Sequence, residues 1–135
     1  MIRRVFLAFV VFGVTACGDD GVGLEDIVGT YTLQTADGVT LPAVLVEIGT
    51  TFLLEVTGGS VTLNQDLTCS FSLSVRETED GIVFPIDEVT DVCTYTFNNE
   101  AIAMTDSDAT TVSGSITGST LTVTQPSGIV FIYEK

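Results

Sequence analysis

Alternation of apolar and polar residues is the feature that most restricts the fold of this chain. In the stretch "LTCSFSLSVR", residues 67–76, odd positions are apolar and even positions are polar, as in a strand with one face in water. The stretches 60–65 and 120–125 repeat the pattern and predict that Val61, Leu63, Leu121 and Val123 point inward. No stretch keeps a 3.6-residue period over three turns, so we expect no long helix.

Turn-forming residues separate these runs at short intervals. The signals are Asp37-Gly38, Gly58-Gly59, Asp80-Gly81, Asn98-Asn99, Thr117-Gly118-Ser119 and Pro126-Ser127-Gly128. Runs of about 5–10 residues at this spacing predict an all-β, antiparallel meander. We expect it to cover residues 29–135 and to close as a β-barrel of about 8–10 strands, with a β-sandwich as the alternative. The segment 42–48, "PAVLVEI", fits a short buried strand or a loop.

The first sixteen residues are typical of a secretory signal. Met1-Ile2-Arg3-Arg4 carries two positive charges, and residues 5–16 are apolar or small throughout. This run is too short to cross a bilayer, which needs about 20 apolar residues. We therefore expect the protein to be exported and residues 1–16 to be removed as a signal peptide.

The residues that end this signal resemble a known processing site. Val14-Thr15-Ala16-Cys17 is similar to the lipobox of bacterial lipoproteins. The resemblance implies that the Cys17 thiol is diacylglycerated, that cleavage occurs just before it, and that the new amino end is also acylated. Two or three acyl chains anchor a protein stably to a membrane. An ordinary signal that ends in a chance cysteine is the alternative.

The same resemblance suggests where the protein is held. Residues 17–28 would form the lipidated cysteine and a flexible tether, rich in glycine and acidic residues. In lipoproteins of two-membrane bacteria, an aspartate directly after the cysteine favours retention at the inner membrane. Gly18 occupies that place here. We therefore expect a lipid anchor in the cell envelope, at the outer membrane.

Composition limits the partners of the mature chain. Removal of residues 1–16 leaves 119 residues with two basic and 18 acidic side chains, a formal charge of 2 − 18 = −16. Such a surface repels nucleic acid and anionic headgroups, so acyl chains rather than basic residues must hold the protein to the membrane. Solubility of an exported domain is the simplest explanation of the acidity.

Two cysteines remain once Cys17 is acylated. Cys69 and Cys93 form an even pair in an exported protein, where a disulfide is permitted. A hairpin that turns at Asp80-Gly81 brings Cys69 opposite Val92. One extra residue, such as a bulge near Pro85, moves Cys93 opposite Cys69 and onto the same face. The sequence therefore predicts a Cys69–Cys93 disulfide, with the two cysteines on adjacent strands or meeting across the barrel.

The strand and turn pattern carries a second resemblance, over about residues 29–135. The stretches are "GTYTLQTADGVTLP", "GSVTLNQDLTCSFSLSV", "VSGSITGSTLTV" and the terminal "FIYEK". They are similar to the small lipocalin-like barrels of many bacterial lipoproteins of unassigned function. Gly29-Thr30-Tyr31 stands where lipocalins carry Gly-x-Trp. The resemblance implies a lipocalin-like barrel and does not specify an activity.

Residue types that carry common chemistry are scarce. The chain has no histidine, which removes the commonest general base and most zinc sites. Asp106-Ser107-Asp108, and the trio Asp87, Glu88 and Asp91, offer oxygen atoms to calcium. Neither group matches a twelve-residue calcium loop, so solvated turn acids are the default interpretation. We expect no enzyme, no catalytic residue, no metal and no cofactor.

Two functions stay open for such a barrel. In the first, a packed barrel meets another protein through loops such as 37–42, 77–82 and 106–109. In the second, the interior holds a small apolar ligand. Large inward residues that would fill a small barrel favour the first function: Phe71, Leu73, Tyr95, Phe97, Leu121 and Phe131.

Overall fold

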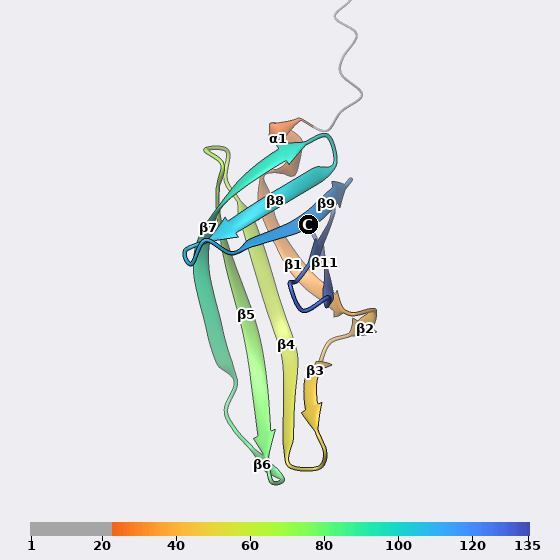
Figure 1. The fold of residues 1–135 in the computed structure, drawn as a ribbon. Helices are drawn as coiled ribbons and strands as arrows, with labels where there is room; N and C mark the ends of the chain where they lie inside the picture. The colour runs from red at the N-terminus through yellow and green to blue at the C-terminus, as the bar shows by residue number, and fades with distance from the viewer. Residues whose placement is uncertain (1–22) are drawn as a thin grey trace, which may run out of the picture.

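The computed structural model describes residues 23–135, which form one short helix and eleven strands (Figure 1). The first elements are α1 (Leu24–Ile27), β1 (Gly29–Ala36), β2 (Val39–Thr40), β3 (Ala43–Ile48), β4 (Phe52–Leu63) and β5 (Thr68–Glu79). They are followed by β6 (Ile82–Val83), β7 (Asp87–Asn98), β8 (Ala101–Asp106), β9 (Thr111–Thr117), β10 (Thr120–Thr124) and β11 (Val130–Glu134). Within residues 23–135, no helix has the length and apolar character that a membrane span requires.

Eight of the strands close into a barrel. The antiparallel order is β1-β11-β10-β9-β8-β7-β5-β4, and β4 then pairs with β1 through Ser60–Leu63 and Gly29–Thr32, which completes the ring. The predicted all-β barrel is confirmed, and the alternative of a sandwich is not adopted. Strands β2, β3 and β6 lie outside the ring.

The core lies inside this ring. Val61, Leu63, Leu121 and Val123 are buried, as the alternation predicts. Leu67 departs from the prediction, because it lies in the β4–β5 turn with a φ of 69° and its side chain is exposed. The whole buried apolar set is Ile27, Tyr31, Leu33, Ala36, Ala43, Val56, Val61, Leu63, Cys69, Cys93, Tyr95, Ile102, Met104, Ile116, Leu121, Val123, Phe131 and Tyr133.

One end of the barrel is closed by α1. Ile27 in this helical turn is 0% exposed, and the Tyr31 hydroxyl donates a hydrogen bond of 2.7 Å to the Ile27 carbonyl. Lys135 Nζ donates to the Asp26 carbonyl at 3.0 Å and ties the last residue to the same end. The sequence predicts a flexible tether over residues 17–28, which includes this helical turn. The apolar Ile27 instead packs on the core, so this part of the segment belongs to the folded domain.

The hairpin of β5 and β7 places the two cysteines as predicted. Glu79 pairs with Ile82 across the turn at Asp80-Gly81, and one residue is gained before Asp87, which pairs with Val75. Cys69 and Cys93 are therefore direct partners on adjacent strands. Their Cα atoms lie 4.8 Å apart, and a disulfide joins them.

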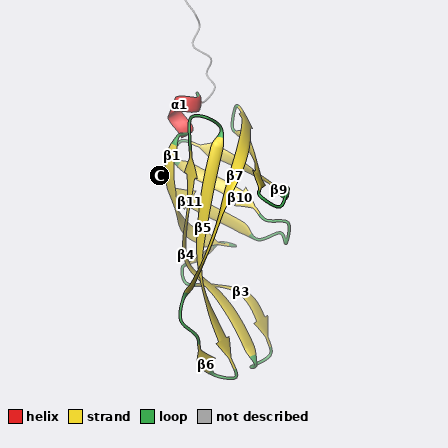
Figure 2. Cartoon of the chain, turned by 90° about the vertical axis from the view of Figure 1, so that its left-hand side faces the viewer, coloured by secondary structure: helices red, strands yellow, loops and turns green. Residues whose placement is uncertain are grey.

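A second, single-layered region projects from the barrel at the end away from α1 (Figures 1 and 2). It consists of β3, the first half of β4, the second half of β5, and β6 with the segment after it. We call residues 43–56 and 75–86 the arm. The segment "PAVLVEI" contributes the strand β3, but Val44, Val46 and Ile48 are exposed, so the expectation of a buried strand is wrong. β3 is an edge strand that pairs only with β4, and no second layer of the described chain packs on it.

Candidate ligand cavity in the barrel

The barrel interior contains a cavity of about 170 Å³. Seven of the eight ring strands contribute to its wall, because their inward positions converge there. The residues that line it are Val61, Phe71, Ser72, Leu73, Val89, Cys93, Met104, Asp106, Thr110, Val112, Val123, Gln125, Phe131 and Tyr133. Ten of the fourteen are apolar or aromatic, and the four polar members are Ser72, Asp106, Thr110 and Gln125.

The polar members place the cavity near the open end of the barrel. Asp106 is the last residue of β8, Thr110 lies in the β8–β9 connection, and Gln125 lies in the β10–β11 connection. These connections lie at the strand ends opposite to those that meet α1 (Figure 1). The cavity is thus closed at depth by the packed core under α1, and its polar groups stand toward the other end.

The size of the cavity restricts its contents. An engineered cavity of about 150 Å³ with an apolar wall stays dry and takes up benzene, whereas pockets for drug-sized ligands occupy about 300–1,000 Å³. At about 170 Å³, this cavity fits a small apolar molecule or one end of a longer apolar chain. An anionic ligand would lose its hydration without gaining a basic partner, because no lysine or arginine lines the cavity.

Two aromatic residues on β11 form the deeper wall. The rings of Phe131 and Tyr133 meet edge to face, with centroids 6.3 Å apart and an interplanar angle of 86°. Burial raises the pKa of Tyr133 to about 12, since the ionised phenolate would be poorly solvated there. Tyr133 therefore remains neutral at ordinary pH, and the wall keeps its apolar character.

The cavity exists because the large inward residues do not fill the barrel. Phe71, Leu73 and Phe97, which the sequence analysis counted among the filling residues, are only partly buried. The wall formed by β9 and β10 carries smaller side chains, such as Val112 and Val123. On the same strand as Val112, Gly114 allows close backbone approach, since a Cβ there would lie 2.2 Å from the Thr122 carbonyl oxygen.

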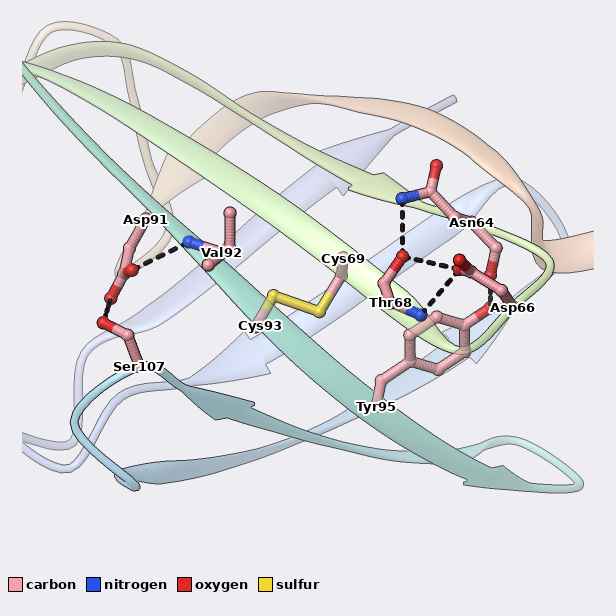
Figure 3. The surroundings of a disulfide bond; sticks show 9 residues. All are labelled: Asn64, Asp66, Thr68, Cys69, Asp91, Val92, Cys93, Tyr95 and Ser107. Carbon is pink, nitrogen blue, oxygen red and sulfur yellow. Dashed lines mark hydrogen bonds between the residues drawn. A yellow bond between two sulfur atoms is a disulfide. The ribbon is translucent and has the colours of Figure 1, made fainter.

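The disulfide and its neighbours hold the wall formed by β5 and β7 (Figure 3). Next to Cys69, the Asp66 carboxylate accepts hydrogen bonds from the backbone N–H and the hydroxyl of Thr68. The hydroxyl contributes most to the lowered pKa of Asp66. The Tyr95 hydroxyl donates to the Asn64 carbonyl at 2.6 Å. These contacts fix the β4–β5 turn against β7.

Two of the acidic residues considered for calcium, Asp106 and Asp91, hold local structure through their carboxylates. Asp106 Oδ1 accepts hydrogen bonds of 2.9 Å from the backbone N–H groups of Asp108 and Thr110. Asp91 accepts from the Ser107 hydroxyl at 2.7 Å and from the Val92 N–H, and the Ser107 hydrogen bond lowers the pKa of Asp91 most. Within residues 23–135, no three acidic, cysteine or histidine side chains gather as a metal site would require.

The other predicted positions are spread over the molecule. Cys17 lies outside the described residues. Of the loops expected to be accessible, 37–42 contains the turn into β2, 77–82 forms a tip of the arm, and 106–109 lies at the cavity end. Val112 and Met104 are wall residues that the sequence analysis did not identify. The alternation of apolar and polar residues along β8 and β9 could have identified them as inward-pointing.

The geometry defines a class of architecture: a closed, eight-stranded antiparallel barrel with an interior cavity, consistent with a lipocalin-like barrel. No family model, no curated protein and no solved structure matches this chain.

Proposed function

We propose that the barrel is a non-enzymatic binding module that takes a small apolar molecule, or the end of an apolar chain, into its interior. The observation that carries this proposal is the cavity of about 170 Å³ with its predominantly apolar wall. Burial of an apolar ligand there removes its surface from water, at about 25 cal/mol per Å². Large inward residues favour a packed interaction barrel, whereas the cavity supports the alternative of a small apolar ligand in the interior.

Thermal unfolding with a small apolar probe tests this proposal. Benzene and indole fit the volume, and a probe at ten times its dissociation constant should stabilise the folded state by about 1.4 kcal/mol. Val112→Phe places a larger side chain in the cavity wall and should abolish the stabilisation. Val92→Phe is the matched control, because Val92 is 66% exposed on the outer surface.

Two results would contradict the proposal. The first is the absence of any saturable stabilisation by probes of this size. The second is equal stabilisation of the wild type, Val112→Phe and Val92→Phe, since binding would then occur outside the barrel. Turnover of a substrate that is lost on replacement of one carboxylate would contradict the non-enzymatic part.

We also propose that the protein is exported and anchored to the bacterial cell envelope, at the outer membrane, through acyl chains on Cys17. The basic, apolar and small-residue order that ends in Val14-Thr15-Ala16-Cys17 supports this proposal. Labelled palmitate should enter the wild type and not the Cys17→Ser variant. Equal labelling of the two proteins would exclude Cys17 as the attachment site. Separation of the two membranes then tests the location.

The fold supports an arrangement with the cavity turned away from that anchor. The described chain begins at α1, at the closed end of the barrel (Figure 1). Five residues, 18–22, separate Cys17 from Gly23, and the six Cα–Cα steps between these two positions span at most about 22 Å. An acylated Cys17 would thus keep the closed end near the membrane and present the cavity end to the aqueous side.

A further inference from the structure

The arm exposes an unusual share of apolar surface. Among the described residues, seven of the eleven exposed large hydrophobic side chains lie in it. They are Val44, Val46, Ile48, Ile82, Val83, Phe84 and Ile86, and Ile48 is 59% exposed. Beyond Ala43 and Val56 at its base, the arm contains no buried residue.

One face of the arm carries a continuous group of apolar side chains, whereas Val44, Leu53 and Val83 lie on the other face, where they pair with Glu55, Glu47 and Thr78. On β5 the odd positions continue from Leu73 in the barrel wall to Val75, Glu77 and Glu79 in the arm. Their partners on β4 are Val56, Leu54 and Phe52, and Leu54 and Phe52 pair in turn with Val46 and Ile48 on β3. We call Val46, Ile48, Phe52, Leu54, Val75, Glu77 and Glu79 the inner face.

A sheet of this kind normally buries one face. Stable domains stack two layers, because a lone sheet leaves its apolar face in water. The barrel strands satisfy this rule by closing on themselves, and the arm does not. Figure 2 shows the arm extending as a single layer below the barrel. On the inner face Val46 and Ile48 are exposed and Phe52, Leu54 and Val75 are half-buried, and no second layer of residues 23–135 covers this face.

The charge of the arm indicates what kind of partner could bind to its inner face. The arm holds Glu47, Glu55, Glu77, Glu79 and Asp80 against Arg76 alone, a formal charge of 1 − 5 = −4. Arg76 is paired with Glu55 at 2.8 Å, and this pair alternates with the inner-face positions along β4 and β5. Glu77 and Glu79 thus border the apolar surface with no ion pair to any described residue.

We propose that the inner face of the arm docks a segment of a partner protein that carries apolar side chains together with lysine or arginine. The apolar side chains cover Phe52 and Leu54, and the basic side chains lie against Glu77 and Glu79. A second copy of this chain would oppose the same carboxylates, and an anionic lipid surface would repel them. This site is independent of the cavity.

The test uses a defined probe, a synthetic peptide of alternating leucine and lysine, with a leucine–glutamate peptide of equal length for comparison. The protein is the chain from residue 17 to 135 with Cys17→Ser. The lysine peptide should bind, and the glutamate peptide should bind at least tenfold more weakly. Glu77→Gln combined with Glu79→Gln should weaken binding at least tenfold.

Matched controls separate the arm from the general acidity of the chain. Glu25→Gln with Glu100→Gln removes two carboxylates from outside the arm and should change affinity less than twofold. Phe52→Thr with Leu54→Thr should weaken binding at least tenfold, and Val92→Thr should not. A cooperative urea transition followed by the fluorescence of the buried tyrosines shows that each variant is folded. If the Phe52→Thr, Leu54→Thr variant does not fold, the binding measured for the Glu77→Gln, Glu79→Gln variant still tests the proposal.

Three results would overturn the proposal. Equal weakening by the arm and control carboxylate pairs would show diffuse attraction to an acidic protein. Dimerisation in sedimentation equilibrium that the Phe52→Thr, Leu54→Thr variant abolishes would make the occupant a second copy. Arm-dependent binding to phosphatidylglycerol vesicles would make it a lipid surface.

Discussion

Removal of the Cys69–Cys93 disulfide should cost this domain a large part of its stability. The bridge joins positions separated by 24 residues, on adjacent strands in direct register. In the chain-entropy model, opening a loop of this length destabilises the folded state by about 3.5 kcal/mol at 25 °C. The free energy of unfolding of a small domain is about 5–15 kcal/mol. The double variant Cys69→Ala, Cys93→Ala should therefore remain folded, with a much smaller free energy of unfolding.

Urea unfolding followed by tyrosine fluorescence provides the assay. The chain has no tryptophan and three tyrosines, and Tyr31, Tyr95 and Tyr133 are all buried, so they report on the core. With an m-value of about 1.7 kcal/mol per M, the midpoint should fall by about 2 M. The wild type treated with a reductant should follow the double variant. A shift below about 0.5 M in both would refute the reasoning.

Three further perturbations probe the core and the closed end. Tyr31→Phe removes the hydrogen bond to the buried Ile27 carbonyl and should destabilise the fold by about 1–2 kcal/mol in the same urea assay. Leu121→Ala should cost about 2–5 kcal/mol, since Leu121 is 0% exposed, whereas Val92→Ala on the surface should stay within about 0.5 kcal/mol. The pKa of Tyr133 is raised from 10.0 to about 12, so its contribution to stability is complete below pH 10 and is lost as pH rises toward 12. Tyr133→Phe should reduce this loss of stability, which urea midpoints between pH 9 and 12 would measure.

The strands and the disulfide could be predicted because local patterns determine them. Alternation on β5 placed Cys69 and Phe71 on one face, and the Asp80-Gly81 turn fixed the hairpin register. Proline cannot donate to a ladder, so a register shift near Pro85 was the expected place for the extra residue. The structure gains one residue between Val83 and Asp87. Each of these inferences uses contacts between residues close in sequence.

The features that sequence reasoning missed depend on distant contacts. Ring closure joins Gly29–Thr32 to Ser60–Leu63, and no local pattern specifies that pairing. Ile27 belongs to a very short apolar run, Ile27-Val28, after two acidic residues, and it is buried only because the end of the barrel lies beside it. "PAVLVEI" has the composition of a buried strand. Its exposure follows from the position of β3 at the sheet edge, beyond the ring.

The cavity was the least predictable feature, because it depends on small differences in side-chain volume. The sequence indicates which residues point inward, and it correctly places Leu121 and Phe131 in the core. Whether they fill the space depends on the curvature of the ring and on how far Phe71 and Leu73 turn toward it. Interiors are close-packed, so a void of about 170 Å³ is a departure that the composition of inward positions alone does not reveal.

The cavity and the inner face of the arm share one strand, and this arrangement determines which substitutions can tell them apart. On β5, Leu73 lines the cavity, and Val75 and Glu77 follow on the same face in the arm. A change at Leu73 would disturb both regions, because neighbouring positions in one packed strand are coupled. Val112 belongs to the cavity wall alone, and Phe52 lies at the far end of the arm. A loss of apolar-ligand binding on substitution of Val112 can therefore be assigned to the cavity, and a loss of peptide binding on substitution of Phe52 can be assigned to the arm.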